Sequence, residues 1–250
     1  MTQILVEVCV DSLAGAQAAL EAGAHRLELC CELSVGGLTP GAGLVHEVVA
    51  LGLPTIVLIR PRAGDFLFDA ADWRVMTRDV AWVRQAGAAG VAIGGLTARG
   101  GVPVEELRGS LAGLDGGEAC FHRAFDGLAD PEGALGLLAE LGFQRILSSG
   151  GSCDALAGST HLARWKAEAP PGLEFMPGGG IRPENVAEVL GRTGARSVHF
   201  SARRPCPPAM EHLNPAVDLH QRAAHARSST SRNEIERYLA AITAAGYHLA

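Results

Sequence analysis

The chain has 250 residues, of which 48% are apolar and 19% charged, and its formal net charge is -6. A chain of this length and composition buries a large core, in one α/β barrel or in two smaller domains. The acidic balance argues against a nucleic-acid partner, and no apolar run approaches the roughly 18 residues of a membrane span. The start has no basic leader and the six cysteines form no CxxC pair, so we expect a cytoplasmic protein with reduced thiols.

Strand-like and helix-like stretches alternate along the chain. Strands are predicted at residues 4–10, 26–31, 55–60, 90–96, 118–125, 145–149, 173–177 and 197–202. Helices are predicted at residues 12–22, 41–51, 72–87, 103–113, 131–141, 154–168, 183–191 and 231–246. Eight such units favour a closed (β/α)8 TIM barrel, with residues 1–250 as a single domain. An open doubly wound sheet is the alternative, and it fits less well because no first-turn GxGxxG appears.

Local signals mark several boundaries of these elements. Capping residues precede three of the predicted helices: Asp11-Ser12, Asp130-Pro131, and Ser231 with Glu234 as a capping box. The segment 203–230 after the eighth strand is too long and proline-rich for a simple connection. It is interpreted either as a lid over the mouth of the barrel or as a mobile surface loop. Three histidines lie in it: His212, His220 and His225.

The first two predicted strands share an unusual Glu-x-Cys pattern inside an apolar run. Glu7 and Cys9 in VEVCV lie on one strand face, as do Glu28 and Cys30 in LELCC. The opposite faces carry valine and leucine, which suit the helix side of a barrel, so the glutamates and cysteines are predicted to point inward. Burying an unpaired carboxylate costs several kcal/mol, so positive partners are expected on inward positions of other strands.

Polar residues that follow other strands are the candidates for this partnership. Arg60 ends the third strand, and the fifth strand, CFHRAFD, offers His122, Arg123 and Asp126. The eighth strand offers His199 and Ser201. Polar residues at the carboxyl ends of barrel strands are typical of an active site. The alternative is a structural layer of buried ion pairs that fills the barrel.

Two glycine-rich loops supply candidate anion-binding groups near the same end of the barrel. MPGGGI after the seventh strand contains Gly178, Gly179 and Gly180, and SSGG after the sixth contains Ser149 and Gly150. Glycines let backbone amides approach a ligand, and the loops after strands 7 and 8 bind phosphate in many barrels. Glycines that merely form tight turns are the alternative interpretation.

Six motifs occurring in order resemble those of the CutC family, which is named for copper homeostasis: VEVCVDS, RLELCCELSVGGLTP, IRPRAGDF, FHRAFD, ILSSGG and MPGGGI. The resemblance implies a (β/α)8 barrel, a cytoplasmic protein, a homo-oligomer and a role in copper homeostasis. The copper role falls on Cys9 and Cys30. The polar cluster falls on Glu7, Glu28, Arg60, His122, Arg123 and Asp126.

Three functions therefore stay open at the level of the sequence. Two inward cysteines suit Cu(I), because soft thiolates bind it well. Alternatively, the glutamates with His122 and Arg60 suit general acid–base chemistry on a small anionic, or phosphorylated, metabolite, and a divalent metal held by Glu7, Glu28, His122 and His199 is a variant of this. A Schiff base is excluded because the only lysine, Lys166, lies on a predicted helix. A non-catalytic small-molecule binding protein is the third.

Overall fold

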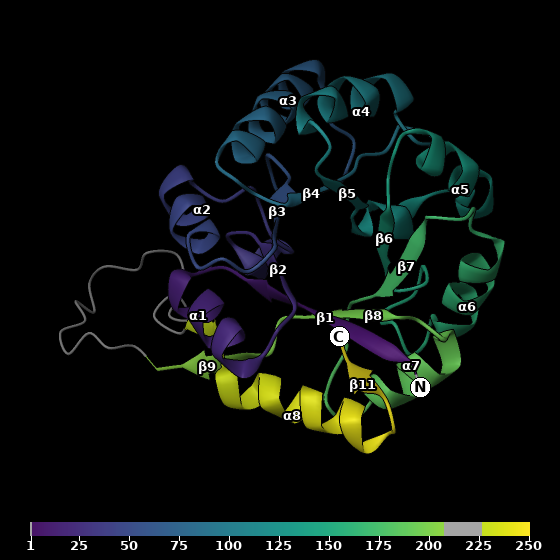
Figure 1. Cartoon of the computed structure of the whole chain (residues 1–250). Helices are drawn as coiled ribbons and strands as arrows, with labels where there is room; N and C mark the ends of the chain where they lie inside the picture. The colour runs from purple at the N-terminus through teal and green to yellow at the C-terminus, as the bar shows by residue number, and fades with distance from the viewer. Residues whose placement is uncertain (1, 208–226) are drawn as a thin grey trace, which may run out of the picture.

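The computed structural model describes residues 2–207 and 227–250. Eight parallel strands form a nearly closed barrel with helices outside it, so the predicted (β/α)8 fold is confirmed (Figure 1). The barrel strands are β1 (Gln3–Val10), β2 (Arg26–Leu29), β3 (Thr55–Ile59), β4 (Gly90–Ile93), β5 (Glu118–Phe121), β6 (Arg145–Ser148), β7 (Glu174–Pro177) and β8 (Ser197–Phe200). Strands β1 to β7 pair in sequence order, and β8 pairs with β1.

The helices cover the outer face of the barrel, as Figure 1 shows. They are α1 (Leu13–Ala22), α2 (Ala42–Val49), α3 (Ala70–Gln85), α4 (Val104–Leu111), α5 (Pro131–Glu140), α6 (Ser159–Glu168), α7 (Val186–Thr193) and α8 (Arg232–Ala244). Short 3-10 helices are η1 (Leu33–Val35), η2 (Ala112–Leu114) and η3 (Arg123–Gly127), and the strands outside the barrel are β9 (Arg203–Cys206), β10 (Arg227–Thr230) and β11 (His248–Leu249). None of the helices in the described ranges is both long and apolar enough to span a membrane.

The two faces of each strand build two separate cores. Residues such as Val6, Val8 and Leu27 pack outward against the helices in one large buried cluster. A smaller cluster fills the inside of the barrel and contains Cys9, Cys30, Ile56, Leu58, Ala92, Cys120, Leu147 and Met176. The prediction that the Glu-x-Cys faces point into the barrel therefore agrees with the burial of both cysteines inside it.

Two of the three predicted helix N-caps form in the structure. The caps at Ser12 and Asp130 form as predicted, since they accept from the amides of Gly15 and Gly133. The capping box at Ser231 does not form. Glu234 instead pairs with Arg204 and Arg237.

The fifth barrel strand is shorter than predicted, ending at Phe121 instead of residue 125. His122 follows it and accepts a hydrogen bond at Nδ1 from the amide of Ala124, which starts η3. The chain therefore turns at the mouth of the barrel, and His122, Arg123 and Asp126 lie on this turn.

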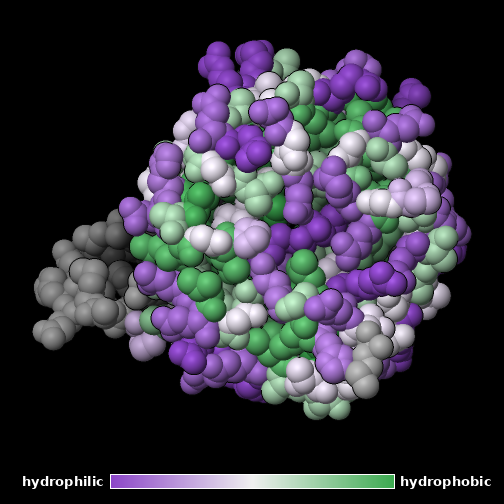
Figure 2. Space-filling view, in the orientation of Figure 1, coloured by the Kyte–Doolittle hydropathy of each residue, from purple (hydrophilic) through white to green (hydrophobic). Residues whose placement is uncertain are grey.

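The described ends of the predicted lid, residues 203–207 and 227–230, form an antiparallel ladder between β9 and β10. β9 lies near α1 and α8 in Figure 1, and Thr230 Oγ1 donates to the carbonyl of Ser201. His212, His220 and His225 lie outside the described residues. Figure 2 shows hydrophilic side chains across the middle of the barrel end that faces the viewer.

Candidate functional site

The pairing register of three strands surrounds Glu7 with two basic side chains. Glu7 on β1 lies opposite Arg26 on β2 and opposite His199 on β8. Register partners in parallel strands point to the same face, so all three side chains point into the barrel. Arg26 Nε lies 2.5 Å from Glu7 Oε2, and His199 Nδ1 donates to Glu7 Oε1 at 2.8 Å.

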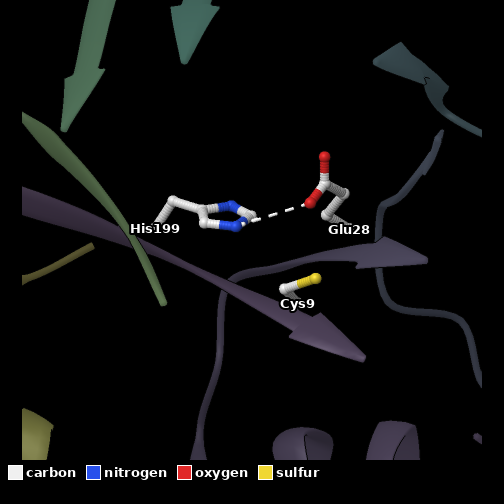
Figure 3. A group of neighbouring side chains, drawn as sticks. All are labelled: Cys9, Glu28 and His199. Atoms are coloured by element: carbon white, nitrogen blue, oxygen red, sulfur yellow. Dashed lines mark ion pairs between the residues drawn. The ribbon is translucent and has the colours of Figure 1, made fainter. Parts of the chain in front are cut away.

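His199 also faces the second glutamate. Its Nε2 atom lies 3.4 Å from Glu28 Oε2, as the dashed line in Figure 3 shows. The imidazole thus sits between two buried carboxylates, with Cys9 beside Glu28 (Figure 3). One ring nitrogen contacts each carboxylate, an arrangement that an imidazolium can adopt because both of its nitrogens are donors.

The two glutamates have opposite pKa shifts. Burial alone would raise the pKa of Glu7, but the hydrogen bond from His199 and the charge of Arg26 lower it to about 2. Burial raises the pKa of Glu28, and the charge of Glu7 adds to this rise against the opposing charge of His199. Burial would lower the pKa of His199, but the charges of Glu28 and Glu7 raise it. Glu7 thus favours its ionised form, while Glu28 and His199 both favour their protonated forms more than they would in water.

A chain of ion pairs continues from Arg26 toward the other side of the barrel. Arg26 Nη1 lies 3.6 Å from Glu118, and Arg145 lies 3.1 Å from Glu118 and 3.5 Å from Glu174. This layer, which includes Glu7, resembles the structural alternative, although Glu118 and Glu174 are partly exposed. Glu7 does not line the mouth pocket, whereas Glu28 and His199 do.

The mouth pocket is a cavity of about 100 Å³ at the carboxyl ends of the strands. Its wall combines polar side chains with apolar ones: Cys9, Glu28, Cys30, Leu33, Gly36, Leu58, Arg60, Phe66, His122, Arg123, Leu147 and His199. A small, largely apolar cavity with a few convergent polar groups is the usual form of a small-molecule site.

The expectation that Arg60 compensates the glutamates is wrong. Its Nη atoms donate to the carbonyls of Val35, Gly37 and Gly64, and its guanidinium lies over the ring of Phe66. Residue 60 follows β3 at the rim of the pocket, so its side chain braces the surrounding loops. Arg26 takes the role that Arg60 was expected to have.

Arg123 and Asp126 form a separate network with the loop after β6. Asp126 accepts hydrogen bonds from the hydroxyl of Ser148, from the amide and hydroxyl of Ser149, and from the amide of Gly151. Arg123 Nε donates to Asp126, and its Nη2 donates to Ser149 Oγ. Asp126 and Ser149 are thus engaged in internal hydrogen bonds, and their predicted catalytic and ligand-binding roles stay predictions.

The two glycine-rich loops contain some backbone amides that donate internal hydrogen bonds and others that do not. The amide of Gly150 donates to Ser148 Oγ and that of Gly178 to the Ser148 carbonyl, so neither is free for a ligand. In the described ranges, no residue accepts a hydrogen bond from the amides of Gly179 or Gly180. These two glycines line a second hollow of about 250 Å³. It shares with the mouth pocket the residues Cys9, Leu33, Arg123 and His199, and it also contains Ser201.

The two cysteines assigned to copper lie together at the pocket wall. Cys9 Sγ is 3.8 Å from Cys30 Sγ. Ligand atoms of Cys9, Glu28 and His199 all lie within 4.8 Å of one another. The contact with Cys30, together with burial and the charge of Glu28, raises the pKa of the Cys9 thiol. The donor set fits a soft ion, whereas the local charge opposes the thiolate that would bind it.

The sequence matches a known protein family over most of its length. A sequence model of the CutC family matches residues 4–204. The chain belongs to the CutC family. It is 42% identical over 207 residues to a CutC family protein of Caulobacter vibrioides, covering 83% of this chain and 84% of that protein. It is 40% identical over 216 residues to a human copper homeostasis protein cutC homolog, covering 86% and 79% respectively.

Solved structures agree with this membership. The CutC crystal structure from Streptococcus agalactiae has a TM-score of 0.75 and 30% identity, covering 79% of this chain and 98% of that one. Phosphoribosyl anthranilate isomerase from Thermotoga maritima has a TM-score of 0.60 at 12% identity, which shows the barrel fold alone. The part of the chain matched to the CutC family, residues 4–204, contains every side chain of the mouth pocket and leaves α8 outside.

Proposed function

We propose that the mouth pocket of this CutC family member is an acid–base site that acts on a small anionic molecule. One observation carries the proposal, namely the imidazole of His199 held between two buried carboxylates at the pocket wall. A histidine whose pKa is tuned by neighbouring carboxylates is suited to take up and release a proton during a reaction. In this role Glu7, which lies outside the pocket wall, orients His199 through its hydrogen bond, and Glu28 and His199 face the bound molecule.

The residues present favour proton transfer next to a carbonyl group. Glu28, whose pKa is raised, is suited to remove a proton from carbon and return it. His199, whose pKa is also raised, is suited to donate to the oxygen that becomes negative. The chain's only lysine, Lys166, is exposed on α6, so carbonyl activation by a Schiff base does not apply.

Hydrogen exchange in heavy water tests this function. We expect the protein to exchange the carbon-bound hydrogens of small 2-oxo acids such as pyruvate for deuterium, observed by proton NMR. Glu28→Gln should slow the exchange by roughly 100-fold or more, because it removes the base. Glu174→Gln is the matched control. It neutralises a carboxylate that pairs with Arg145 in the ion-pair layer, and it should leave the rate unchanged. Binding of such acids without exchange would support the non-catalytic binding protein instead.

Copper binding is the second candidate function, and the 3.8 Å separation of Cys9 Sγ and Cys30 Sγ favours it. Both sulfurs, with His199 and Glu28 next to them, would hold Cu(I) as the protein's cargo. The charge of Glu28 opposes formation of the Cys9 thiolate. A Cu(I) site here would therefore have to overcome the repulsion between the Glu28 carboxylate and the Cys9 thiolate.

A Cu(I) titration under reducing conditions distinguishes the two functions. We expect weak, substoichiometric uptake that is shared with the exposed thiol of Cys153. The double variant Cys9→Ser, Cys30→Ser should then bind nearly as much copper as the parent, while Cys153→Ser binds less. Tight one-to-one uptake that is lost only in the double variant would establish the copper site and contradict this expectation.

A further inference from the structure

Arg60 is a buried cation without a carboxylate partner. Its residue is only 6% exposed, and it forms no ion pair with any residue in the described ranges. Three carbonyl groups accept from its Nη atoms. Carbonyls satisfy hydrogen-bond donors but leave the positive charge uncompensated, which is costly in a buried position. An anion that enters the pocket would remove this cost.

The guanidinium still has donors for such an anion. A guanidinium has five N–H groups, and three of those of Arg60 are used by the carbonyls of Val35, Gly37 and Gly64. The Nε atom is buried and has no hydrogen-bond partner among the described residues. Nε and Nη2 form the edge of a guanidinium that a carboxylate binds with both oxygens.

His122 provides a second unused donor in the wall of the same pocket. Its Nδ1 accepts from the amide of Ala124, so the neutral ring carries its proton on Nε2. Residue 122 is 4% exposed, and its Nε2 atom is buried without a partner among the described residues. Burial and the charge of Arg60 lower the pKa of His122 to about 3, so the ring stays a neutral donor near physiological pH.

We propose that the mouth pocket binds a small monocarboxylate, whose carboxylate group takes the free N–H groups of Arg60 and His122. The rings of Phe66 and His122 contact each other at a centroid distance of 5.0 Å, and Phe66 also lies under Arg60. Phe66 therefore connects the two donors on one side of the cavity. The proposal deepens the acid–base function above, on which it rests for the fate of the ligand, by naming the class of substrate.

Charge and volume favour a carboxylate over a phosphate at these donors. Arg60 supplies one uncompensated positive charge, which matches a monoanion, whereas a phosphate dianion would leave a buried negative charge. The cavity of about 100 Å³ suits a molecule of few atoms. The rest of its wall is formed largely by Leu33, Leu58, Phe66 and Leu147.

The same placement accounts for reactivity. Glu28 and His199 line the same small cavity as Arg60 and His122. A carboxylate held by Arg60 and His122 therefore leaves the adjoining carbons facing Glu28 and His199. A carbonyl next to the carboxylate would acidify the hydrogens on the following carbon, which is the substrate that the acid–base pair requires. The substrate class is accordingly a small 2-oxo acid.

Calorimetric titration with pyruvate, acetate and inorganic phosphate tests the proposal. We expect pyruvate to bind one-to-one, and phosphate to bind at least about 10-fold more weakly because of its second charge. In His122→Asn the side-chain oxygen replaces Nδ1 and keeps the bond from Ala124, while the donor at Nε2 is lost. Pyruvate affinity should then fall by about 10-fold, the usual value of a hydrogen bond to a charged group. His122→Gln, which restores a donor near the Nε2 position, should recover part of the affinity.

Several outcomes overturn the proposal. They are phosphate binding as tight as that of pyruvate, pyruvate affinity unchanged in His122→Asn, and no binding of either pyruvate or acetate. If His122→Asn does not fold, the ¹⁵N shift of His122 Nε2 in the parent protein decides, because it must move on adding pyruvate. Exchange in the parent and pyruvate affinity in His122→Asn separate the acid–base function from the carboxylate site. Tight pyruvate binding without exchange in the parent would contradict the acid–base function alone, and exchange with unchanged affinity in His122→Asn would contradict the carboxylate site alone.

Discussion

Replacing Arg26 by methionine should lower the free energy of unfolding by about 3–5 kcal/mol, because it leaves the buried carboxylate of Glu7 without its main counter-charge. Both side chains are nearly fully buried, at 4% and 3% exposure. Methionine has a similar length and suits the contact with Met176, so the lost packing is small. Urea unfolding of the variant beside the parent measures the effect.

A double variant distinguishes the ion pair from packing. Arg26→Met combined with Glu7→Gln removes both charges, so most of the lost stability should return. The amide oxygen introduced by Glu7→Gln can still accept a hydrogen bond from His199. A loss below about 1 kcal/mol in the single variant, as for a surface ion pair, would contradict this role for Arg26.

Glu28→Gln should leave the unfolding midpoint unchanged or raise it near neutral pH, while it slows the hydrogen exchange by roughly 100-fold or more. The folded-state pKa of Glu28 is raised above 4.5, mainly by burial. A carboxyl group with a raised pKa contributes stability below its unfolded pKa, and this stability is lost as the pH rises through the folded pKa. The ionised form is therefore the costly one, and the amide resembles the neutral form in shape and charge.

Thermal unfolding at two pH values tests this directly. The advantage of Glu28→Gln should shrink below the unfolded pKa near 4.5, where the parent is also protonated. Glu174→Gln is the matched control, since it removes the charge that pairs with Arg145 while its amide oxygen can still accept from Ser197, and its midpoint should not rise. A clear fall in the midpoint of Glu28→Gln near neutral pH would make Glu28 a structural partner of His199. It would contradict the proposed role of Glu28 as the catalytic base.

The repeating units of this fold were predictable from sequence because their signals are local. Alternating faces correctly placed Glu7, Cys9, Glu28 and Cys30 inside the barrel, since the period of a strand depends only on its own residues. The breaks in the pattern were harder to predict. His122 ends β5 early because its side chain caps η3, a competition that the apolar run does not reveal.

Partner choice inside the barrel depends on register, which the sequence alone does not specify. Arg26 lies two residues before Glu28 on the same strand face, so the motif RLELCC already contained the missing cation. It stands at the first residue of its strand, whereas Arg60 stands past the end of β3. Strand stagger places Arg26 level with Glu7 and leaves Arg60 at the rim. The position of a basic residue along its strand would have been the useful signal.

The protonation of His199 tests the acid–base account most directly, because it requires no knowledge of the substrate. Nitrogen NMR of ¹⁵N-histidine-labelled protein can follow both ring nitrogens of His199 through a pH titration. We expect the pKa of His199 to lie above its ordinary 6.5 in the parent, because of the charges of Glu28 and Glu7, and to be lower in Glu28→Gln. A pKa at or below 6.5 in the parent that is unchanged in Glu28→Gln would contradict a proton shared between Glu28 and His199.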